Sequence, residues 1–138
     1  MSLEIGESCE RVFHVDDAAI EAFGAASGDR NPIHFDEAAG AASRFGGRVA
    51  HGMLAGAYIS AVIGSQLPGP GAIYLSQTLR FRRPVKIGDP VTAIVTIKAL
   101  DSRGHATLTT VCKVHGKTVA DGEAVVMVPR RETGGREA

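Results

Sequence analysis

Apolar and polar residues alternate along the second half of the chain with the two-residue period of a β-strand. From Val91 to Ile97 every odd-numbered position is apolar, which predicts a strand with one buried face. Further strands are predicted over residues 73–84, 107–114 and 118–128. Turn residues separate these segments at Gly88-Asp89-Pro90 and at His115-Gly116. The pattern therefore predicts antiparallel strands joined by short turns.

The first half of the chain has mainly helical spacing. The predicted elements are a strand, a helix, a loop and a second short helix, at residues 8–15, 16–27, 28–35 and 37–43. Asp16 or Asp17 can cap the first helix and Gly28 can end it, while Asp36 can cap the second. We expect a loop between them because Pro32 disfavours helical backbone at the residue before it.

The segment from Met53 to Gln66 is apolar on almost every side of a helix. A helix that is apolar all round is buried inside a protein. The run Pro68-Gly69-Pro70-Gly71 then ends it. Together with the strands, this predicts an α+β fold in which an antiparallel sheet packs on one fully buried central helix.

Composition narrows the class of protein. The length of 138 residues fits a single domain, predicted over residues 1–129 and followed by a polar, non-periodic tail at 130–138. The 15 basic residues balance the 15 acidic ones, which argues against a nucleic-acid partner. The apolar stretch 53–63 is too short to span a membrane, residues 1–10 lack a signal-peptide pattern, and two cysteines make no disulfide framework. We therefore expect a cytoplasmic protein.

The most informative segment for chemistry is S-G-D-R-N-P-I-H-F-D, residues 27–36. A tight loop here can turn the Asp29 carboxylate and the His34 imidazole towards one cavity, where a single water contacts both. General acid–base catalysis needs such a pair, because a carboxylate accepts a proton and an imidazole titrates near neutral pH. The alternative is that Asp29 is an ordinary turn residue and His34 a half-buried histidine with satisfied hydrogen bonds. The residues alone leave both interpretations open.

The second segment is the opening of the apolar helix at His51-Gly52. Free backbone N–H groups in the first turn from Gly52 would polarise a carbonyl group lodged there. Alternatively, Gly52 only permits a tight turn into the helix and His51 caps it. Ser60, two turns further on, either bonds back to the preceding turn or faces the cavity and anchors Asp29, His34 or a ligand.

The remaining polar residues give weaker signals. Asp29, His34, Asp36 and His51 are metal-ligating types, but no Cys or His pair has zinc-like spacing, so no metal site is predicted. Neither a phosphate-binding loop nor a nucleophile elbow occurs. A run of basic residues consists of Arg80, Arg82, Arg83 and Lys86. It is either a solvated face or a contact for the phosphates of a substrate carrier.

Both chemical segments resemble the MaoC-like (R)-specific enoyl-CoA hydratases. The D-x4-H motif of that family matches Asp29 to His34 with Asn31-Pro32 between them, and its H-G-M helix start matches His51-Gly52-Met53. The similarity runs from about residue 12 to residue 128. It continues in order through Gln66-Leu67-Pro68-Gly69, Tyr74-Leu75, Phe81, Pro84-Val85 and Gly88-Asp89. The chain looks most like the single-domain hydratases that feed polyester synthesis.

The resemblance implies a hot-dog fold, a curved antiparallel sheet wrapped around a long helix, and a homodimer with the sheets joined edge to edge. It implies that Asp29 and His34 bind the catalytic water, that Asn31 shapes the loop, and that the Gly52 amide holds a thioester oxygen. It places Ser60 near the catalytic pair. The implied reaction is (R)-specific hydration of trans-2-enoyl-CoA to (3R)-hydroxyacyl-CoA, with coenzyme A as part of the substrate and no other cofactor.

Three other functions remain compatible with the sequence. A (3R)-hydroxyacyl-carrier-protein dehydratase of fatty-acid synthesis runs the same chemistry in reverse. A hot-dog thioesterase would instead release a free thiol from acyl-CoA. A non-catalytic acyl-CoA-binding subunit is disfavoured by the presence of both Asp29 and His34.

Overall fold

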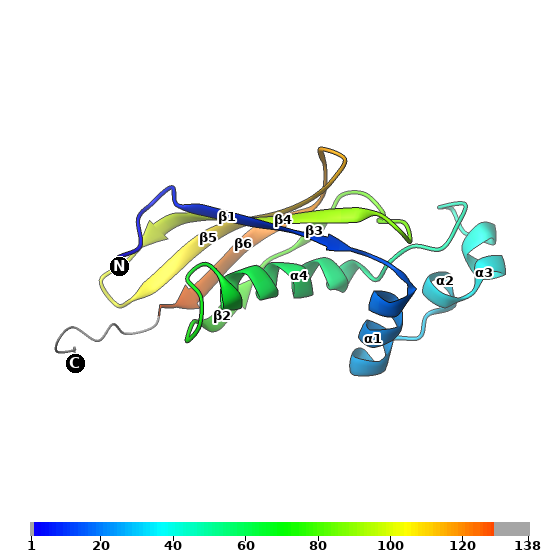
Figure 1. Cartoon of the computed structure of the whole chain (residues 1–138), viewed down its shortest axis with the longest axis horizontal. Helices are drawn as coiled ribbons and strands as arrows, with labels where there is room; N and C mark the ends of the chain where they lie inside the picture. Colours follow the sequence, from blue (N-terminus) through cyan, green and yellow to red (C-terminus); the bar gives the residue numbers. More distant parts are fainter. Residues whose placement is uncertain (1, 129–138) are drawn as a thin grey trace.

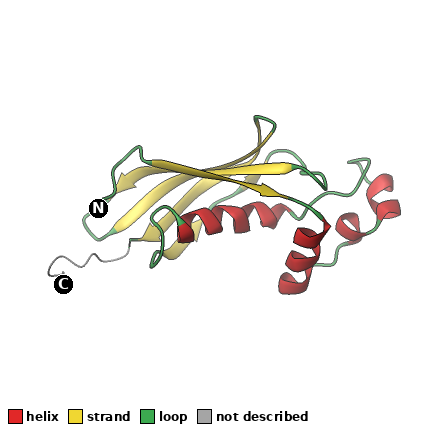
Figure 2. Cartoon of the chain, in the orientation of Figure 1, coloured by secondary structure: helices red, strands yellow, loops and turns green. Residues whose placement is uncertain are grey.

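The computed structural model describes residues 2–128, which form a curved sheet with one helix along its concave side and three helices beyond its end (Figures 1 and 2). The predicted tail at 130–138 lies outside the described residues. The elements in chain order are β1 (Ser8–His14), α1 (Asp17–Ser27), α2 (Pro32–Phe35), α3 (Glu37–Ala42), α4 (Gly52–Ser65), β2 (Ile73–Gln77), β3 (Arg80–Phe81), β4 (Pro90–Leu100), β5 (His105–Val114) and β6 (Lys117–Met127).

The strands form one antiparallel sheet in the order β1-β4-β5-β6-β2, with β3 also paired to β6. Along β4 and β5 buried residues alternate with less buried ones, as the sequence period predicted. The buried face packs on α4, and Val95, Leu108 and Ile59 are fully buried in the same core cluster. The predicted α+β class and the sheet packed on a helix are therefore confirmed.

The segment 73–84 is divided, and the prediction of one continuous strand there is wrong. Between β2 and β3 the chain passes so close to β6 that a Cβ atom on Gly122 would lie 1.8 Å from the carbonyl oxygen of Thr78. Thr78 donates its N–H to the carbonyl of Glu123 and accepts from the N–H of Glu123 with its hydroxyl. This contact interrupts the strand at Thr78, and only the missing side chain of Gly122 allows it.

Helix α4 is buried on one side, so the prediction of a helix buried all round is wrong for the single chain. Its buried residues are Leu54, Ala55, Ile59, Val62 and Ile63. On the other side Met53 is 58% exposed, and Ala57, Ser60 and Gly64 are also exposed. The reason is that the sheet covers one face of α4 only (Figure 1).

The helices α1 to α3 each begin at a side-chain cap, and α2 replaces part of the loop predicted over 28–35. Asp16 accepts the N–H of Ala19, and Asp36 accepts the N–H of Ala38. Asn31 accepts the N–H of Ile33 and places Pro32 in the first turn of α2. Proline fits the first turn of a helix because the N–H it lacks has no partner there. Pro32 therefore keeps Asn31 extended but does not prevent a helical turn after it.

Within residues 2–128, every helix is too short or too polar to traverse a lipid bilayer.

Candidate active site

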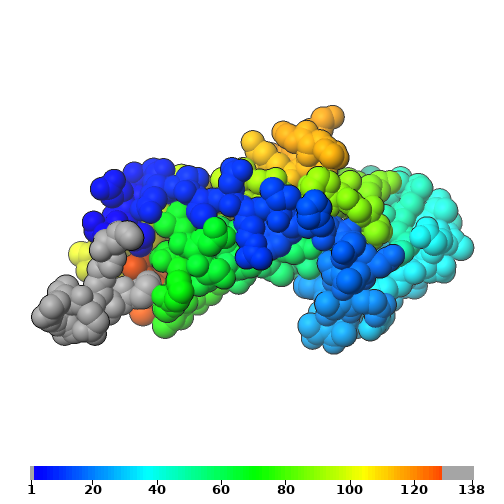
Figure 3. Space-filling model, viewed as in Figure 1, coloured from blue at the N-terminus to red at the C-terminus, as the bar shows by residue number. Residues whose placement is uncertain are grey.

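Residues 16–51, which we call the helical lobe, project beyond one end of the sheet and lead into α4 (Figure 3). Arg48 ties its helices together. Its Nε donates to the carbonyl of His34 at 2.7 Å, and its terminal nitrogens reach Asp17 at 2.8 Å and Glu37 at 3.4 Å. The bond with Asp17 raises the pKa of Arg48, so its guanidinium stays charged. One side chain thus holds α1, α2 and α3 around His34.

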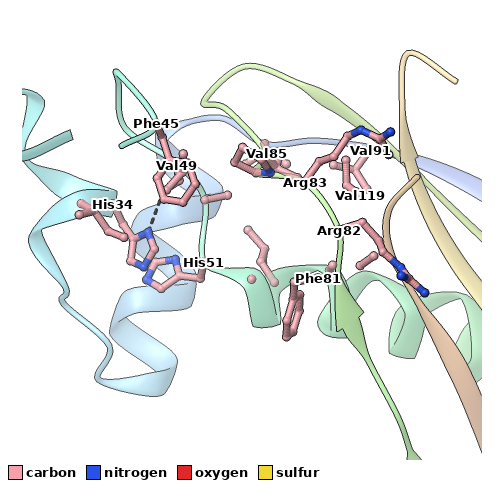
Figure 4. Close-up of a pocket in the computed structure, with 18 of the residues that line it drawn as sticks. His34, Phe45, Val49, His51, Phe81, Arg82, Arg83, Val85, Val91 and Val119 are labelled. Atoms are coloured by element: carbon pink, nitrogen blue, oxygen red, sulfur yellow. Dashed lines mark hydrogen bonds between the residues drawn. The ribbon is translucent and has the colours of Figure 1, made fainter. Parts of the chain in front are cut away.

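His34 lies on α2 and is 7% exposed. Its Nδ1 is 2.7 Å from the carbonyl oxygen of Val49 (Figure 4, dashed line). Because a carbonyl oxygen only accepts, this contact places the ring proton on Nδ1. The Nε2 of His34 is therefore left with a free lone pair, which is the form required of a general base.

Asp29 is exposed in the loop before α2. Its Oδ1 accepts the N–H of Asn31 at 3.1 Å, and its own N–H donates to the Ser27 hydroxyl at 3.0 Å. One side-chain atom each from Asp29, His34 and His51 lie within 4.8 Å of one another. A water makes hydrogen bonds of about 2.8 Å, so one water can bridge two groups at that separation. The structure thus brings Asp29 and His34 together, and Asp29 is a turn residue as well.

His51 is 3% exposed and stands at the N-cap position of α4, but its side chain does not cap the helix. Instead its Nε2 bonds the carbonyl oxygen of Asp29 at 3.0 Å. The interpretation of His51 as a helix cap is therefore wrong. The His34 and His51 rings lie side by side, with centroids 4.0 Å apart (Figure 4).

Gly52 is the first residue of α4 and is exposed, with the ring of Phe81 beside it. A Cβ atom at this position would lie 3.2 Å from the Phe81 ring, closer than ordinary contact, so the packing favours glycine. The first N–H groups of a helix have no acceptor within the helix, and the helix dipole adds positive potential there. The Gly52 N–H is therefore suited to binding a carbonyl oxygen that gains negative charge.

A cavity of about 450 Å³ lies beside this region. His34, His51 and Gly52 line it, and Asp29 is not among its lining residues. Its apolar walls come from the sheet and α4, and include Val15, Leu54, Tyr58, Val91 and Ala120. Arg82 and Arg83 also line it, with their guanidinium groups on the side away from the two histidines (Figure 4). The cavity thus has an apolar interior and a basic side.

The predicted basic run divides into different environments. Arg82 pairs with Asp121 at 3.1 Å, while Arg83 donates to the carbonyl of Thr118. Lys86 donates to the carbonyl of Phe45 and does not line the cavity, and Arg80 is exposed outside it. Arg44, which the sequence analysis missed, does line the cavity. An isolated arginine in a loop carries no sequence signal for this position.

Ser60 is exposed and does not line the cavity. It lies eight positions after Gly52, about 12 Å further along the helix. Among the hydrogen bonds of the described residues, none joins the Ser60 hydroxyl to the preceding turn. Both interpretations of Ser60, as a back-bonded hydroxyl and as an anchor of the catalytic pair, therefore fail within one chain.

The geometry of Asp29, His34 and His51 is poor for a metal ion. An imidazole binds a metal in the plane of its ring, and the rings of His34 and His51 are only 31° from parallel at 4.0 Å. Their lone pairs therefore do not converge on one point. Asp36, the other candidate ligand, caps α3.

Two further polar groups are buried close to or beneath the cavity. The Tyr58 ring stacks on Phe13 and its hydroxyl has no partner among the described residues, and burial raises the pKa of this hydroxyl. Burial also raises the pKa of the Cys112 thiol to about 12, so this thiol stays protonated and is a poor nucleophile. The acid–base candidates are therefore Asp29 and His34.

Known proteins resemble this chain over nearly its whole length. The MaoC like domain family matches residues 4–125. An (R)-specific enoyl-CoA hydratase from Rhodospirillum rubrum is 46% identical over 127 residues, which cover 91% of this chain and 88% of the relative. A 3-hydroxybutyryl-CoA dehydratase from Methylorubrum extorquens is 45% identical, with coverage of 94% and 83%.

The fold is shared as well. The solved structure of an (R)-hydratase from A. caviae involved in PHA biosynthesis superimposes with a TM-score of 0.90 at 43% identity. The superposition covers 93% of this chain and 98% of that one. The curved sheet around α4 is the hot-dog fold. By its sequence, its fold and the arrangement of its loop motif, the chain belongs to the MaoC-like domain family.

Proposed function

We propose that the protein is an (R)-specific enoyl-CoA hydratase, which adds water to trans-2-enoyl-CoA and forms (3R)-hydroxyacyl-CoA. The observation that carries the proposal is the convergence of Asp29 and His34 beside the free N–H groups at the start of α4. The relatives' names support the substrate class.

In the proposed reaction the thioester oxygen accepts a hydrogen bond from the Gly52 N–H, which draws electrons from the conjugated double bond. A water held between Asp29 and His34 loses a proton to this pair as its oxygen bonds to C3. The electrons of the double bond move into the enolate of the thioester, and the Asp29/His34 pair then returns a proton to C2, which restores the pair. His34 can accept through Nε2 because Val49 holds its other ring nitrogen protonated.

The carrier portion of the substrate is proposed to leave the cavity along its basic side. Arg83 bonds a backbone carbonyl and no carboxylate among the described ion pairs, so its charge is available for a phosphate group. Arg82 is less available because Asp121 pairs with it. Coenzyme A is then part of the substrate, and the proposed mechanism needs no cofactor and no metal.

The proposal includes a homodimer in the cytoplasm. Strand β2 is the last strand on its side of the sheet, and Ile73, Tyr74 and Leu75 on it are exposed. A second copy would cover this apolar edge. The free thiols of Cys9 and Cys112 support a reducing compartment. Light scattering should give twice the 14.4 kDa chain mass, and Leu75→Lys should shift the protein to the monomer. A monomeric wild type contradicts this part of the proposal.

The reaction is tested with crotonyl-CoA, whose conjugated-thioester absorbance should fall when the protein is added. A dehydrogenase specific for the (3R) product reads the stereochemistry. Asp29→Asn and His34→Asn should each lower kcat by about 10²- to 10⁴-fold. The His34→Asn side chain keeps a donor at the position of Nδ1 for Val49 but lacks Nε2, so it removes the base with little change in packing.

The matched control is His115→Asn, a change in the exposed turn between β5 and β6 that should leave kcat unchanged. Release of free thiol from crotonyl-CoA would identify a thioesterase instead. Wild-type turnover retained in His34→Asn would remove His34 from the mechanism.

A further inference from the structure

His51 is almost completely buried at the junction between the helical lobe and α4, yet neither helix capping nor the apolar core explains it. We infer that His51 is a positioning residue that holds the Asp29 loop in register with the Gly52 amide. The inference rests on the proposed hydration and adds a residue to it. His51 itself is not required to exchange a proton with the substrate.

The direction of the hydrogen bond defines the state of the imidazole. The partner of Nε2 is the carbonyl oxygen of Asp29, which only accepts, so Nε2 carries the proton. Nδ1 is buried and has no partner among the described residues. Among the described residues, the one hydrogen bond of the imidazole is therefore to the backbone of Asp29, the residue that carries the proposed catalytic carboxylate.

Aromatic neighbours hold the ring in this orientation. Its centroid is 4.0 Å from His34, 4.8 Å from Phe23 and 5.5 Å from Phe35. A ring packed on three sides has few alternative rotamers. The bond to Asp29 is therefore rigid, and it comes from an element other than the loop that it holds.

The chain connectivity makes this bond informative about catalysis. His51 immediately precedes Gly52, the proposed donor to the thioester oxygen. Asp29 has two local bonds, through its N–H and its Oδ1, and both partners belong to the same loop. Among the hydrogen bonds of the described residues, the His51 bond is the one that joins this loop to the start of α4. Without it the peptide after Asp29 can rotate and move the carboxylate, and a misplacement of about 1 Å costs on the order of 100-fold in rate.

Two substitutions separate the hydrogen bond from the packing. His51→Phe keeps an aromatic ring but loses the donor. His51→Gln loses the ring but places an amide N–H at the position of Nε2. We expect His51→Phe to lower kcat for crotonyl-CoA about 10- to 100-fold with KM within about twofold, because the thioester contacts remain. His51→Gln should retain kcat within about fivefold of wild type. Equal losses in both variants would contradict a positioning role carried by the hydrogen bond.

A measurement on the unchanged protein covers the case in which either variant fails to fold. Nitrogen NMR at neutral pH should find the proton of His51 on Nε2 and that of His34 on Nδ1, with slow solvent exchange for His51. A His51 proton on Nδ1, or a doubly protonated ring, overturns the inference. If instead the proposed hydratase function is wrong, the wild-type protein will leave crotonyl-CoA unchanged, whatever the tautomer of His51.

Discussion

The sheet and the helical lobe are stabilised by different interactions. The core of the sheet consists of fully buried aliphatic residues, such as Val95, Leu108 and Val126. In the lobe, the buried aliphatic side chains among the described residues are Ile20 and Val49. Capping side chains and Arg48 hold the lobe through bonds to the backbone. We therefore expect changes in the sheet to alter mainly stability, and changes in the lobe to alter mainly the geometry of Asp29 and His34, the proposed catalytic pair.

The sharpest test of this difference is a pair of glycine substitutions. Gly122→Ala would push a methyl group into the Thr78 carbonyl, and Gly40→Ala would push one into the backbone of Arg48, 2.5 Å from its nitrogen. Gly122→Ala should lower the free energy of unfolding by about 3 kcal/mol, since a backbone obstacle cannot rotate away. Gly40→Ala should lower the free energy of unfolding by less than Gly122→Ala does, but it should lower kcat by more. The reason is that it displaces Arg48, whose side chain donates to the His34 carbonyl.

Denaturant unfolding and crotonyl-CoA kinetics on both variants decide between the two effects. If Gly40→Ala keeps full kcat while Gly122→Ala loses it at equal folded concentration, the assignment of stability and geometry to the two regions is wrong.

Replacement of Arg48 gives the next largest effect. Arg48→Met keeps the aliphatic stem, which is largely buried, but loses the bond to the His34 carbonyl. Its ion pairs contribute little, because the side chains of Asp17 and Glu37 are 73% and 84% exposed. We expect kcat to fall about 10- to 100-fold through movement of α2, while the midpoint of unfolding changes by only a few degrees. A loss of stability without loss of kcat per folded molecule would contradict this role.

The periodic parts of this fold could be predicted from the sequence. The alternation in β4 and the apolar run of α4 identified this strand and the helix, since burial repeats with the local geometry. The break at Thr78 could not be predicted, because it depends on Gly122 in a strand 44 positions away. One-sided burial of α4 was missed for a similar reason: the residue pattern shows that a side is apolar, but not whether the sheet reaches it.

In the site, the spacing of Asp29 and His34 around Asn31-Pro32 predicted their proximity. The roles of His51 and Arg48 could not be predicted, since both side chains bond backbone carbonyls far away in sequence. A carbonyl group is the same at every residue and leaves no signal in the sequence. Arg44 at the cavity was missed because its neighbours in sequence are not its neighbours at the site.

The smallest effect is expected at the far end of the sheet, in the turn between β4 and β5. Asp101 accepts the N–H groups of His105 and Arg103, and these bonds lower the pKa of its carboxyl group. A carboxyl group with a lowered folded-state pKa stabilises the fold above its unfolded pKa, and this contribution is lost as the pH falls. Asp101→Asn should therefore flatten the pH dependence of the melting temperature in the acid range. The kcat for crotonyl-CoA at neutral pH should not change. A changed kcat would show that this turn and the helical lobe are energetically coupled, which contradicts the expected independence.

The bond from His34 to the main chain of Val49 also matters for redesign of the substrate range. Val49 lines the cavity, while its carbonyl oxygen accepts the hydrogen bond from the His34 ring. Exchanging this side chain for a smaller or larger aliphatic one leaves the carbonyl in place. Position 49 therefore lets an engineer reshape the cavity while the hydrogen bond that orients His34, the proposed general base, is kept.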